Sequence, residues 1–274
     1  MNWRLIAVVV LLLALCSGAL WQPYNPDAID MVTRHAGLSW DHLMGTDHLG
    51  RDVFSRMLVA GWRTALVIIT VGAIGLFGGS LIGTMAAILG GWREILLLRM
   101  AETFIVVPTL IVALTAAAIF GLSPLSAGLA LGLANIGPYT LLSHSLTKRA
   151  LGLPYSNAAR ALGVSDLTLM LRHILPGTMP VLLTYVGSQA GACAVAYASL
   201  AFIGLGADPS KPDWGSMLFE YRVFLFDYPG LVLFPGCALA ITAGLLNLLF
   251  DRDTHAAVNN ARTADYRPSN RDTR

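Results

Sequence analysis

The chain has 274 residues, of which 55% are hydrophobic and 12% are charged, and its mean hydropathy is +0.65. These values exclude an ordinary soluble globular protein and indicate several membrane spans. The net charge of +2 does not predict a nucleic-acid partner, and three cysteines that lie singly in apolar segments predict neither a disulfide nor a metal site.

The N-terminus carries a long apolar run that is preceded by Arg4 and followed by Trp21. A secretory signal peptide looks similar. Because an aromatic residue at the interface is typical of a membrane helix, we interpret residues 1–21 as a retained transmembrane anchor. The polar residues 22–60 are predicted to form an extracytoplasmic segment.

Five further apolar spans follow, so the sequence predicts an all-α membrane protein with six transmembrane helices. The first of the five is longer than the roughly 20 residues that a span needs, and its many glycines would let helices approach closely. The second contains Pro108, which predicts a kink. Four of the five spans cover residues 62–91, 125–146, 179–203 and 228–250. The remaining one, second in order, follows the interface residues 92–94 and ends at about residue 120.

Three polar side chains inside these spans are candidates for a polar pathway through the membrane: Asn135, Gln189 and Tyr197. Amide and hydroxyl groups at membrane depth usually face protein or water rather than lipid. Asn135 is the strongest of the three, either facing the pathway or bonding between helices.

The histidines are not predicted to bind metal. His42 and His48 lack the spacing that places two ligands on one helix face, and we interpret them as solvated or hydrogen-bonded side chains. His144 lies near the end of its span beside Lys148 and is interpreted as an interfacial histidine.

Residues 151–176 form a polar island between the fourth and fifth spans. Pro154 suits the first position of a helix, Gly163 suits the residue just past its end, and Ser165 is typical of the N-cap of a second helix. We therefore predict two short amphipathic helices that meet at a glycine turn, rather than a loop lying on the membrane surface. The predicted faces are Tyr155, Ala158, Ala159 and Leu162 on the first helix, and Leu167, Met170, Leu171 and Ile174 on the second.

A second motif, MGTDHLGRDVFSR at residues 44–56, lies in the polar segment before the long span. Gly45 and Gly50 permit backbone angles that other residues avoid. The charged members that we predict to form an ion-pair network are Asp47, Arg51 and Asp52.

The C-terminal residues 252–274 are polar and lack apolar periodicity, so they are predicted to form a disordered cytoplasmic tail. Six spans place both termini on one side of the membrane. With the 151–176 loop on that same side, 12 lysines and arginines lie inside and 6 lie outside. This is the bias expected when the loop faces the cytoplasm.

Three stretches of the sequence resemble the permease subunits of ABC importers. MGTDHLGRDVFSR resembles the LGTDxLGRDxxSR signature of C-type subunits of peptide and nickel permeases, and FIGLGADPSKPDWGSML at residues 202–218 resembles the family's FLGLG…PxWGxM segment. Residues 151–176 are similar to the cytoplasmic "EAA" loop, although Asn157 stands where that motif has its glutamate.

The resemblance implies two sets of site residues. The ATPase-coupling set is Tyr155, Asn157, Ala158, Ala159, Arg160, Gly163, Leu175 and Pro176, and the extracytoplasmic signature is Gly45, Thr46, Asp47, Gly50, Arg51 and Asp52. It also implies a type I importer transmembrane fold with residues 61–251 as the permease core. The expected partners are a homologous B-type permease, two ATPase subunits and an extracytoplasmic binding protein in a bacterial inner membrane.

The resemblance implies that the substrate is a nickel ion or metal chelate, and di- and oligopeptides are the next alternative. The chain is not predicted to be an enzyme or to hold a cofactor, because neither lysine follows a glycine as a phosphate-binding P-loop requires. An ion-coupled transporter would need carboxylates in mid-span. An intramembrane enzyme would have to use Ser145 and His144, which are adjacent on one helix and do not face each other.

Overall fold

The computed structural model describes the backbone of residues 3–204, 208 and 210–265, together with the side chains in those ranges other than those of residues 3–5, 8 and 251–265. The described residues contain no β-strand, and Thr46 and Asp52 form an isolated antiparallel bridge. This confirms the predicted all-α class.

Eleven α-helices lie in the described part of the chain. They are α1 (Trp3–Leu20), α2 (Val53–Ala73), α3 (Ser80–Leu89), α4 (Gly91–Val106), α5 (Thr109–Phe120), α6 (Pro124–Leu151), α7 (Pro154–Ala161), α8 (Asp166–Leu169), α9 (Leu175–Ile203), α10 (Trp214–Tyr221) and α11 (Pro229–Asp265). Single π-helical segments join α2 to α3 (Ile74–Gly79) and α8 to α9 (Met170–Ile174), and short 3₁₀ turns cover Met31–Thr33 and Arg222–Phe224.

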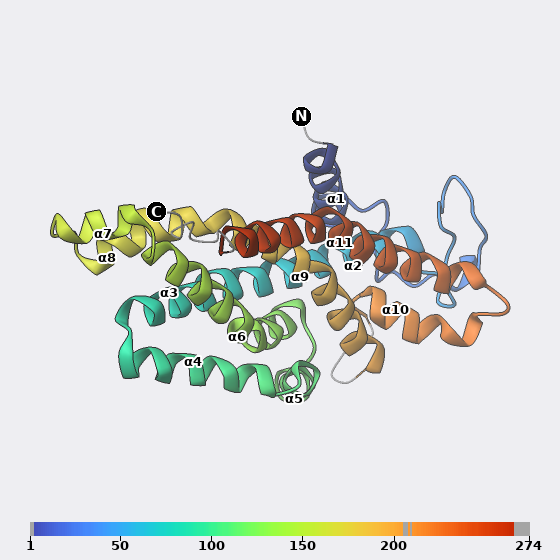
Figure 1. The fold of residues 1–274 in the computed structure, drawn as a ribbon. Helices are drawn as coiled ribbons and strands as arrows, with labels where there is room; N and C mark the ends of the chain where they lie inside the picture. The colour runs from blue at the N-terminus through green and yellow to red at the C-terminus, as the bar shows by residue number, and fades with distance from the viewer. Residues whose placement is uncertain (1–2, 205–207, 209, 266–274) are drawn as a thin grey trace.

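The long helices run in a common direction, so the molecule has two distinct ends (Figure 1). One end carries α7 and α8, and the other carries α10 and the loop between α1 and α2 (Figure 1). The two motifs that the sequence analysis singled out therefore lie at opposite ends of the bundle.

Four continuous helical stretches among the described residues are long and apolar enough to cross a membrane: Val53–Leu89, Pro124–Leu151, Asp166–Ile203 and Pro229–Phe250. The first is 37 residues long, so it extends beyond a bilayer as the sequence predicts. Helices α4 and α5 qualify only as a pair, which is bent by 77°. Pro108 lies at the break. Proline cannot donate the backbone hydrogen bond that a continuous helix needs, and this interrupts the helix. The predicted kink is therefore a complete interruption.

Helix α1 stands across the direction of the other long helices (Figure 1). Its C-terminal half packs on α2 through Leu11 and Leu15, whereas Val10 and Leu13 are exposed. Helix α1 is 18 residues long, and its residues 9–20 are apolar. The described residues thus contain four apolar helical stretches of spanning length, one bent pair and α1, where the sequence predicts six spans.

Glycines bring α6 against the continuous helix formed by α2 and α3. A Cβ added at Gly79 would lie 2.8 Å from the carbonyl oxygen of Ile136, and one at Gly83 would lie 2.2 Å from that of Thr140. The close approach allows hydroxyls to bond between helices: Ser143 donates to the carbonyl of Ser80 at 2.8 Å. Small residues therefore set the helix spacing, as the sequence predicts for this span.

The two larger of the three apolar clusters among the described residues lie inside the bundle. One joins α2, α5, α6 and α9 around Val67, Leu131 and Leu200, and the other joins α1, α2, α10 and α11 around Val53 and Met217. The second cluster lies beneath the polar segment that precedes α2 and holds α10 against the start of α2.

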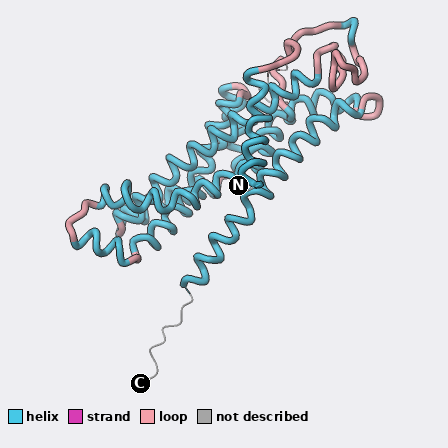
Figure 2. Tube along the Cα trace, turned by 90° about the horizontal axis from the view of Figure 1, so that it is seen from above, coloured by secondary structure: helices cyan, strands magenta, loops and turns pink. Residues whose placement is uncertain are grey.

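Helix α11 continues to Asp265, into residues 252–265 of the segment that the sequence predicts as a disordered tail. Figure 2 shows this helix projecting beyond the bundle toward the C-terminus. The physical reason is that extending an existing helix needs no new nucleus, and residues 251–265 contain neither proline nor glycine. The remaining tail residues, 266–274, lie outside the described residues.

The contact between α3 and α6 gives a direct test of helix spacing. Gly83→Ala places a methyl group against the backbone of Thr140, and the overpacking should destabilise the chain by about 1–3 kcal/mol or more. Gly78→Ala is the matched control, because its nearest neighbour would be the Ile136 side chain at 3.9 Å. Thermal unfolding of both variants in detergent micelles measures the difference, and equal melting temperatures would contradict the packing described here.

Candidate functional site

The 151–176 segment folds as a helical hairpin. Pro154 is in the first turn of α7, and Gly163 ends this helix with φ +78°. The amide of Gly163 donates to the carbonyl of Arg160 at 3.0 Å and that of Val164 to Ala159 at 3.1 Å, the pair of bonds that defines a Schellman motif. The hydroxyl of Ser165 then accepts from the Thr168 amide and caps α8. The predicted glycine turn and N-cap are confirmed.

The second half of the hairpin differs from the prediction. Helix α8 is not a separate helix, because it continues through the π-helical segment into α9 as one stretch, Asp166–Ile203. The extra residue of a π-turn rotates the buried face, so Leu169, Met170 and Ile174 are buried while Leu167 and Leu171 are exposed. Leu175 and Pro176, assigned to the coupling loop, form the first turn of α9.

The two alanines of α7 also point in different directions. Ala159 packs partly against the cluster formed by Ala150, Leu169 and Ile174, whereas Ala158 is exposed. Successive helix positions are about 100° apart, so one step along α7 turns the side chain from solvent at Ala158 toward the cluster at Ala159. Within this chain, Ala158 belongs to the outward face and Ala159 to the inner one.

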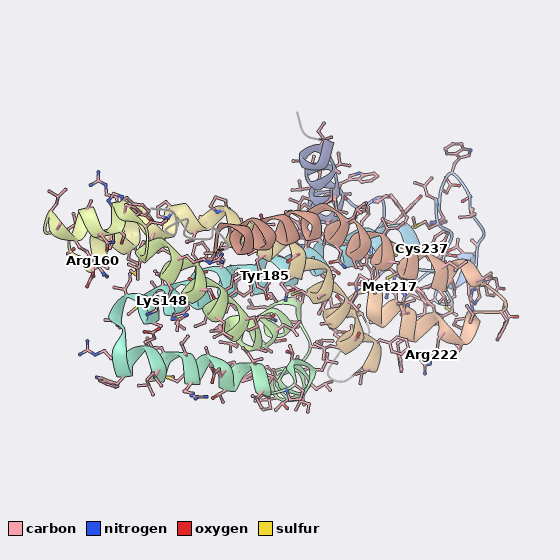
Figure 3. The ribbon with its side chains drawn as sticks, viewed as in Figure 1. Lys148, Arg160, Tyr185, Met217, Arg222 and Cys237 are labelled. Carbon is pink, nitrogen blue, oxygen red and sulfur yellow. The ribbon has the colours of Figure 1, made fainter. Side chains whose placement is uncertain are left out.

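The outward face of the hairpin is an apolar surface that we name the tip patch. Its large side chains and their exposed fractions are Leu153 (48%), Tyr155 (44%), Leu162 (84%), Leu167 (62%) and Leu171 (53%). Arg160 lies beside it and pairs with Asp166 at 3.3 Å, which ties α7 to α8 (Figure 3). The tip patch lies at the end of the molecule, where a partner can reach it.

The opposite end is built on the glycine turns of residues 44–56. Gly45 and Gly50 have φ of +72° and +74°, as the sequence predicts. A Cβ at Gly50 would lie 1.7 Å from the carbonyl oxygen of Asp30, so only glycine fits. The hydroxyl of Thr46 donates to the carbonyl of Thr33 and accepts from the amide of Ala36, which holds the preceding loop against the turn.

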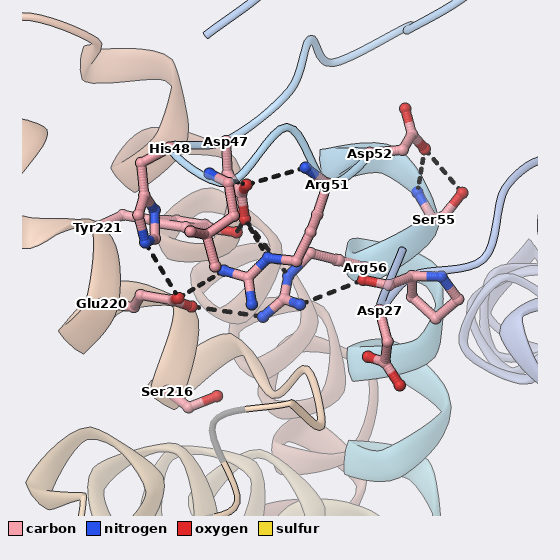
Figure 4. Close-up of polar contacts among 12 residues, drawn as sticks. Asp27, Asp47, His48, Arg51, Asp52, Ser55, Arg56, Ser216, Glu220 and Tyr221 are labelled. Carbon is pink, nitrogen blue, oxygen red and sulfur yellow. Dashed lines mark hydrogen bonds and ion pairs between the residues drawn. The ribbon is translucent and has the colours of Figure 1, made fainter. Parts of the chain in front are cut away.

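A buried ionic network connects this turn to α10 (Figure 4). Arg51 pairs with Asp47 at 2.7 Å and with Glu220, and Arg56 pairs with Glu220 at 3.4 Å. The Tyr221 hydroxyl donates to Asp47 at 3.0 Å. Two carboxylates and two guanidiniums balance one another, which is the condition for burying charges. We name these four charged residues and Tyr221 the ionic junction; the role of Glu220 and Arg56 is not predicted by the sequence.

Asp52 does not take part in the ionic junction, in contrast to the prediction. Its carboxylate caps α2 by accepting from the amide and hydroxyl of Ser55 at 2.8 and 2.7 Å, and it bonds His42 at 2.9 Å. His48 lies 3.6 Å from Glu220. The two histidines are therefore hydrogen-bonded or network side chains, and no cluster of three metal-ligating residues occurs in the described residues.

The charge state of Asp47 is set by its surroundings. Burial alone would raise the pKa of this carboxyl, but the Arg51 guanidinium and the amides of Leu49 and Arg51 outweigh burial and hold the pKa below its usual range. Asp47 is therefore ionised at neutral pH, and the junction is a true ion-pair network.

A second buried contact joins α2, α9 and α10. The guanidinium of Arg63 forms two hydrogen bonds with Asp213 at 2.9 and 3.0 Å, and the Tyr197 hydroxyl donates to the same carboxylate. Tyr197 is only 1% exposed, and within this chain its hydroxyl ties α9 to the start of α10.

The other predicted pathway residues are placed differently. The Asn135 amide donates to the Leu131 carbonyl of its own helix at 2.7 Å, so it makes no bond between helices in this chain. Gln189 is half-buried in α9. His144 lies near the end of α6 and bonds Glu94 at 2.7 Å, with Lys148 on the same carboxylate at 2.8 Å. Its ring is hydrogen-bonded between α6 and α4, consistent with the interfacial interpretation.

These features define a membrane-embedded helical protein whose two polar ends carry a stabilising ionic network and an exposed apolar hairpin. Comparison with known proteins then places it. The model of the family described as "Binding-protein-dependent transport system inner membrane component" matches residues 79–254, more than half of the chain. The chain belongs to this family and is an ABC importer permease of the peptide family.

Named relatives cover nearly the whole chain. The glutathione transport system permease protein GsiD of Escherichia coli O6:K15:H31 is 33% identical over 249 residues, which are 89% of this chain and 81% of the relative. The GsiD protein of Pectobacterium atrosepticum is 33% identical over 247 residues, 89% and 81% of the two chains. The "Probable D,D-dipeptide transport system permease protein DdpC" of Escherichia coli K12 is 32% identical over 246 residues, 90% and 83% of the two chains.

The ionic junction gives the second test. Asp47→Asn keeps the side-chain shape but leaves two buried guanidiniums with one carboxylate, and it should lower the free energy of unfolding by about 3–5 kcal/mol. The control is Glu102→Gln, which removes an exposed ion pair with Arg99 and should change stability by less than about 1 kcal/mol. Thermal unfolding monitored by size-exclusion chromatography compares them, and a melting temperature of Asp47→Asn equal to the control would refute a stabilising role.

Proposed function

We propose that this chain forms one half of the translocation pathway of an ATP-driven importer for di- or oligopeptides. It pairs with a homologous B-type permease, and the pair works with two ATPase subunits and an extracytoplasmic binding protein. The observation that carries the proposal is the tip patch, an apolar surface that the chain exposes at one end and leaves for a partner. The six predicted spans are part of the proposal, with α1 and the bent α4–α5 pair as two of them.

The substrate proposal follows the relatives. GsiD is named as a glutathione permease and DdpC as a probable D,D-dipeptide permease. Glutathione and D,D-dipeptides are peptides or peptide-like molecules. A nickel ion or metal chelate remains the alternative raised by the C-type signature. The relatives named here favour peptides, and purified companion binding protein titrated with peptides and with Ni²⁺ decides between the two.

In the proposed mechanism, the hairpin of α7 and α8 docks on an ATPase subunit and moves with it. Because α8 and α9 form one continuous helix, displacement of the tip patch displaces the whole of Asp166–Ile203. ATP binding shifts the permease between two access states only through contacts that differ between those states. The docking contact at the tip patch would be one of them.

The coupling proposal is tested with Ala158→Asp. Ala158 is exposed in this chain, so the substitution should leave the fold intact. At a docked surface it buries an unpaired charge, which costs several kcal/mol. We expect the ATPase subunits to be lost on co-purification and transport to fall to background.

The matched control is Ala28→Asp, which adds the same charge to an exposed alanine at the opposite end. It should retain the ATPase subunits. Thr168→Ala is a second control within the hairpin, since the backbone amide that bonds Ser165 remains. If Ala158→Asp still binds the ATPase subunits and transports normally, the hairpin is not the docking surface.

The proposed orientation places the loop between α1 and α2 outside and the tip patch inside. Asp41→Cys, in a chain whose natural cysteines are replaced, should react with a membrane-impermeant thiol reagent in intact spheroplasts, because Asp41 is exposed. Asn157→Cys, also exposed, should react only after the membrane is permeabilised. The reverse pattern would invert the topology.

A further inference from the structure

A separate cavity opens beside the start of α2, at the same end as the ionic junction. Its volume is about 330 Å³. Four aromatic rings and two carboxylates contribute to its wall, and no lysine, arginine or histidine does. These six residues are Trp21, Tyr24, Phe54, Trp40, Asp41 and Asp52.

Three of the rings are held in place by the fold. Trp21 and Phe54 meet edge to face with their centroids 6.3 Å apart. Tyr24 stacks at a tilt on His42 at 4.9 Å, and its amide donates to the Ser55 hydroxyl at 3.1 Å, which fixes this segment beside α2. Trp40 is 95% exposed and forms the open rim. The cavity is therefore a partly preformed aromatic cage with one free wall.

The two carboxylates have different roles. Asp52 is committed to capping α2 and to His42. Asp41 is exposed and makes no hydrogen bond or ion pair through its carboxylate in the described part of the chain. Asp41 is thus the charge that is available to a ligand.

Aromatic faces and an available carboxylate both attract positive charge. The face of an aromatic ring carries negative potential, and a cage of several rings recognises alkylated or organic ammonium groups. A metal ion would require several oxygen ligands, whereas an ammonium group also offers carbon atoms that contact the rings. A cavity of this size holds such a head group, and an anion would be repelled by both rings and carboxylates.

We propose that this cavity binds an organic ammonium group. Two molecules share this chemistry: a peptide through its free amino terminus, and an ethanolamine phospholipid through its head group. The proposal does not depend on the transported substrate or on the ATPase contact, so it can fail while the proposed function stands.

Binding is measured on the full chain in phosphatidylglycerol nanodiscs, with tryptophan replaced by 5-fluorotryptophan and observed by ¹⁹F NMR. The signals of Trp21 and Trp40 are assigned with Trp21→Phe and Trp40→Phe. Choline should shift both signals. Its neutral isostere 3,3-dimethylbutan-1-ol has the same shape without the charge, and it should bind at least about tenfold more weakly, a factor that corresponds to 1.4 kcal/mol.

Two variants test the residues. Asp41→Asn and Trp40→Ala alter exposed side chains and should each weaken choline binding at least about tenfold without unfolding the chain. The matched control is Asp227→Asn, an exposed aspartate at the same end that does not line the cavity, and it should leave the affinity within about twofold. Equal binding of choline and its neutral isostere, or unchanged affinity of Asp41→Asn, would overturn the proposal.

Competition identifies the source of the ammonium group. Displacement of choline by Ala-Ala but not by N-acetyl-Ala-Ala assigns the cavity to the amino terminus of a peptide. Loss of choline binding in nanodiscs that contain phosphatidylethanolamine assigns it to the lipid. If neither displaces choline, the binding of choline is adventitious and the proposal is wrong.

Discussion

The pairing of buried charges is the constraint on which the arrangement of this protein depends. Asp47, Arg51 and Arg56 are almost fully buried at one end of a chain that is otherwise apolar. Charges in that position are tolerated only when each finds a partner. Asp47 pairs with Arg51, and both arginines pair with Glu220, far along the chain on α10. The ionic junction thus fixes α10 against the start of α2. The Arg63–Asp213 contact, with Tyr197, adds α9 to the same assembly.

This arrangement links the two ends of the molecule through continuous helices. The stretch Asp166–Ile203 carries Leu167 and Leu171 of the tip patch at its beginning and, near its end, Tyr197, which bonds Asp213. The helix of α2 and α3 runs from the ionic junction to the glycine contacts with α6. A partner that displaces the hairpin would therefore act on a continuous helix whose other end is bonded to Asp213 through Tyr197. The break at Pro108 is the one large interruption among the described candidate spans.

Local chemistry explains what the sequence predicted correctly. Helix caps depend on a few neighbouring residues, so Ser165 and the glycine turn at Gly163 could be recognised without knowing the fold. The same holds for Gly45 and Gly50, for the pairing of Asp47 with Arg51 four residues away, and for the glycine-rich face of the long span. The signature motifs also indicated the permease family, which the family match and the relatives confirm.

The sequence by itself thus determined the all-α membrane class, the turns, the caps and the family. Only the tertiary structure decided which residues complete the buried contacts, because Glu220 and Asp213 meet arginines more than 100 residues away and no local pattern encodes such a meeting. It also decided which side chains of the hairpin face outward. The π-helical segment between α8 and α9 changes the helical register, and Leu167 and Leu171 are exposed. The fold likewise decided the partner of Tyr197, because a hydroxyl at membrane depth needs a partner and the sequence cannot show whether that partner is water or a carboxylate elsewhere in the chain.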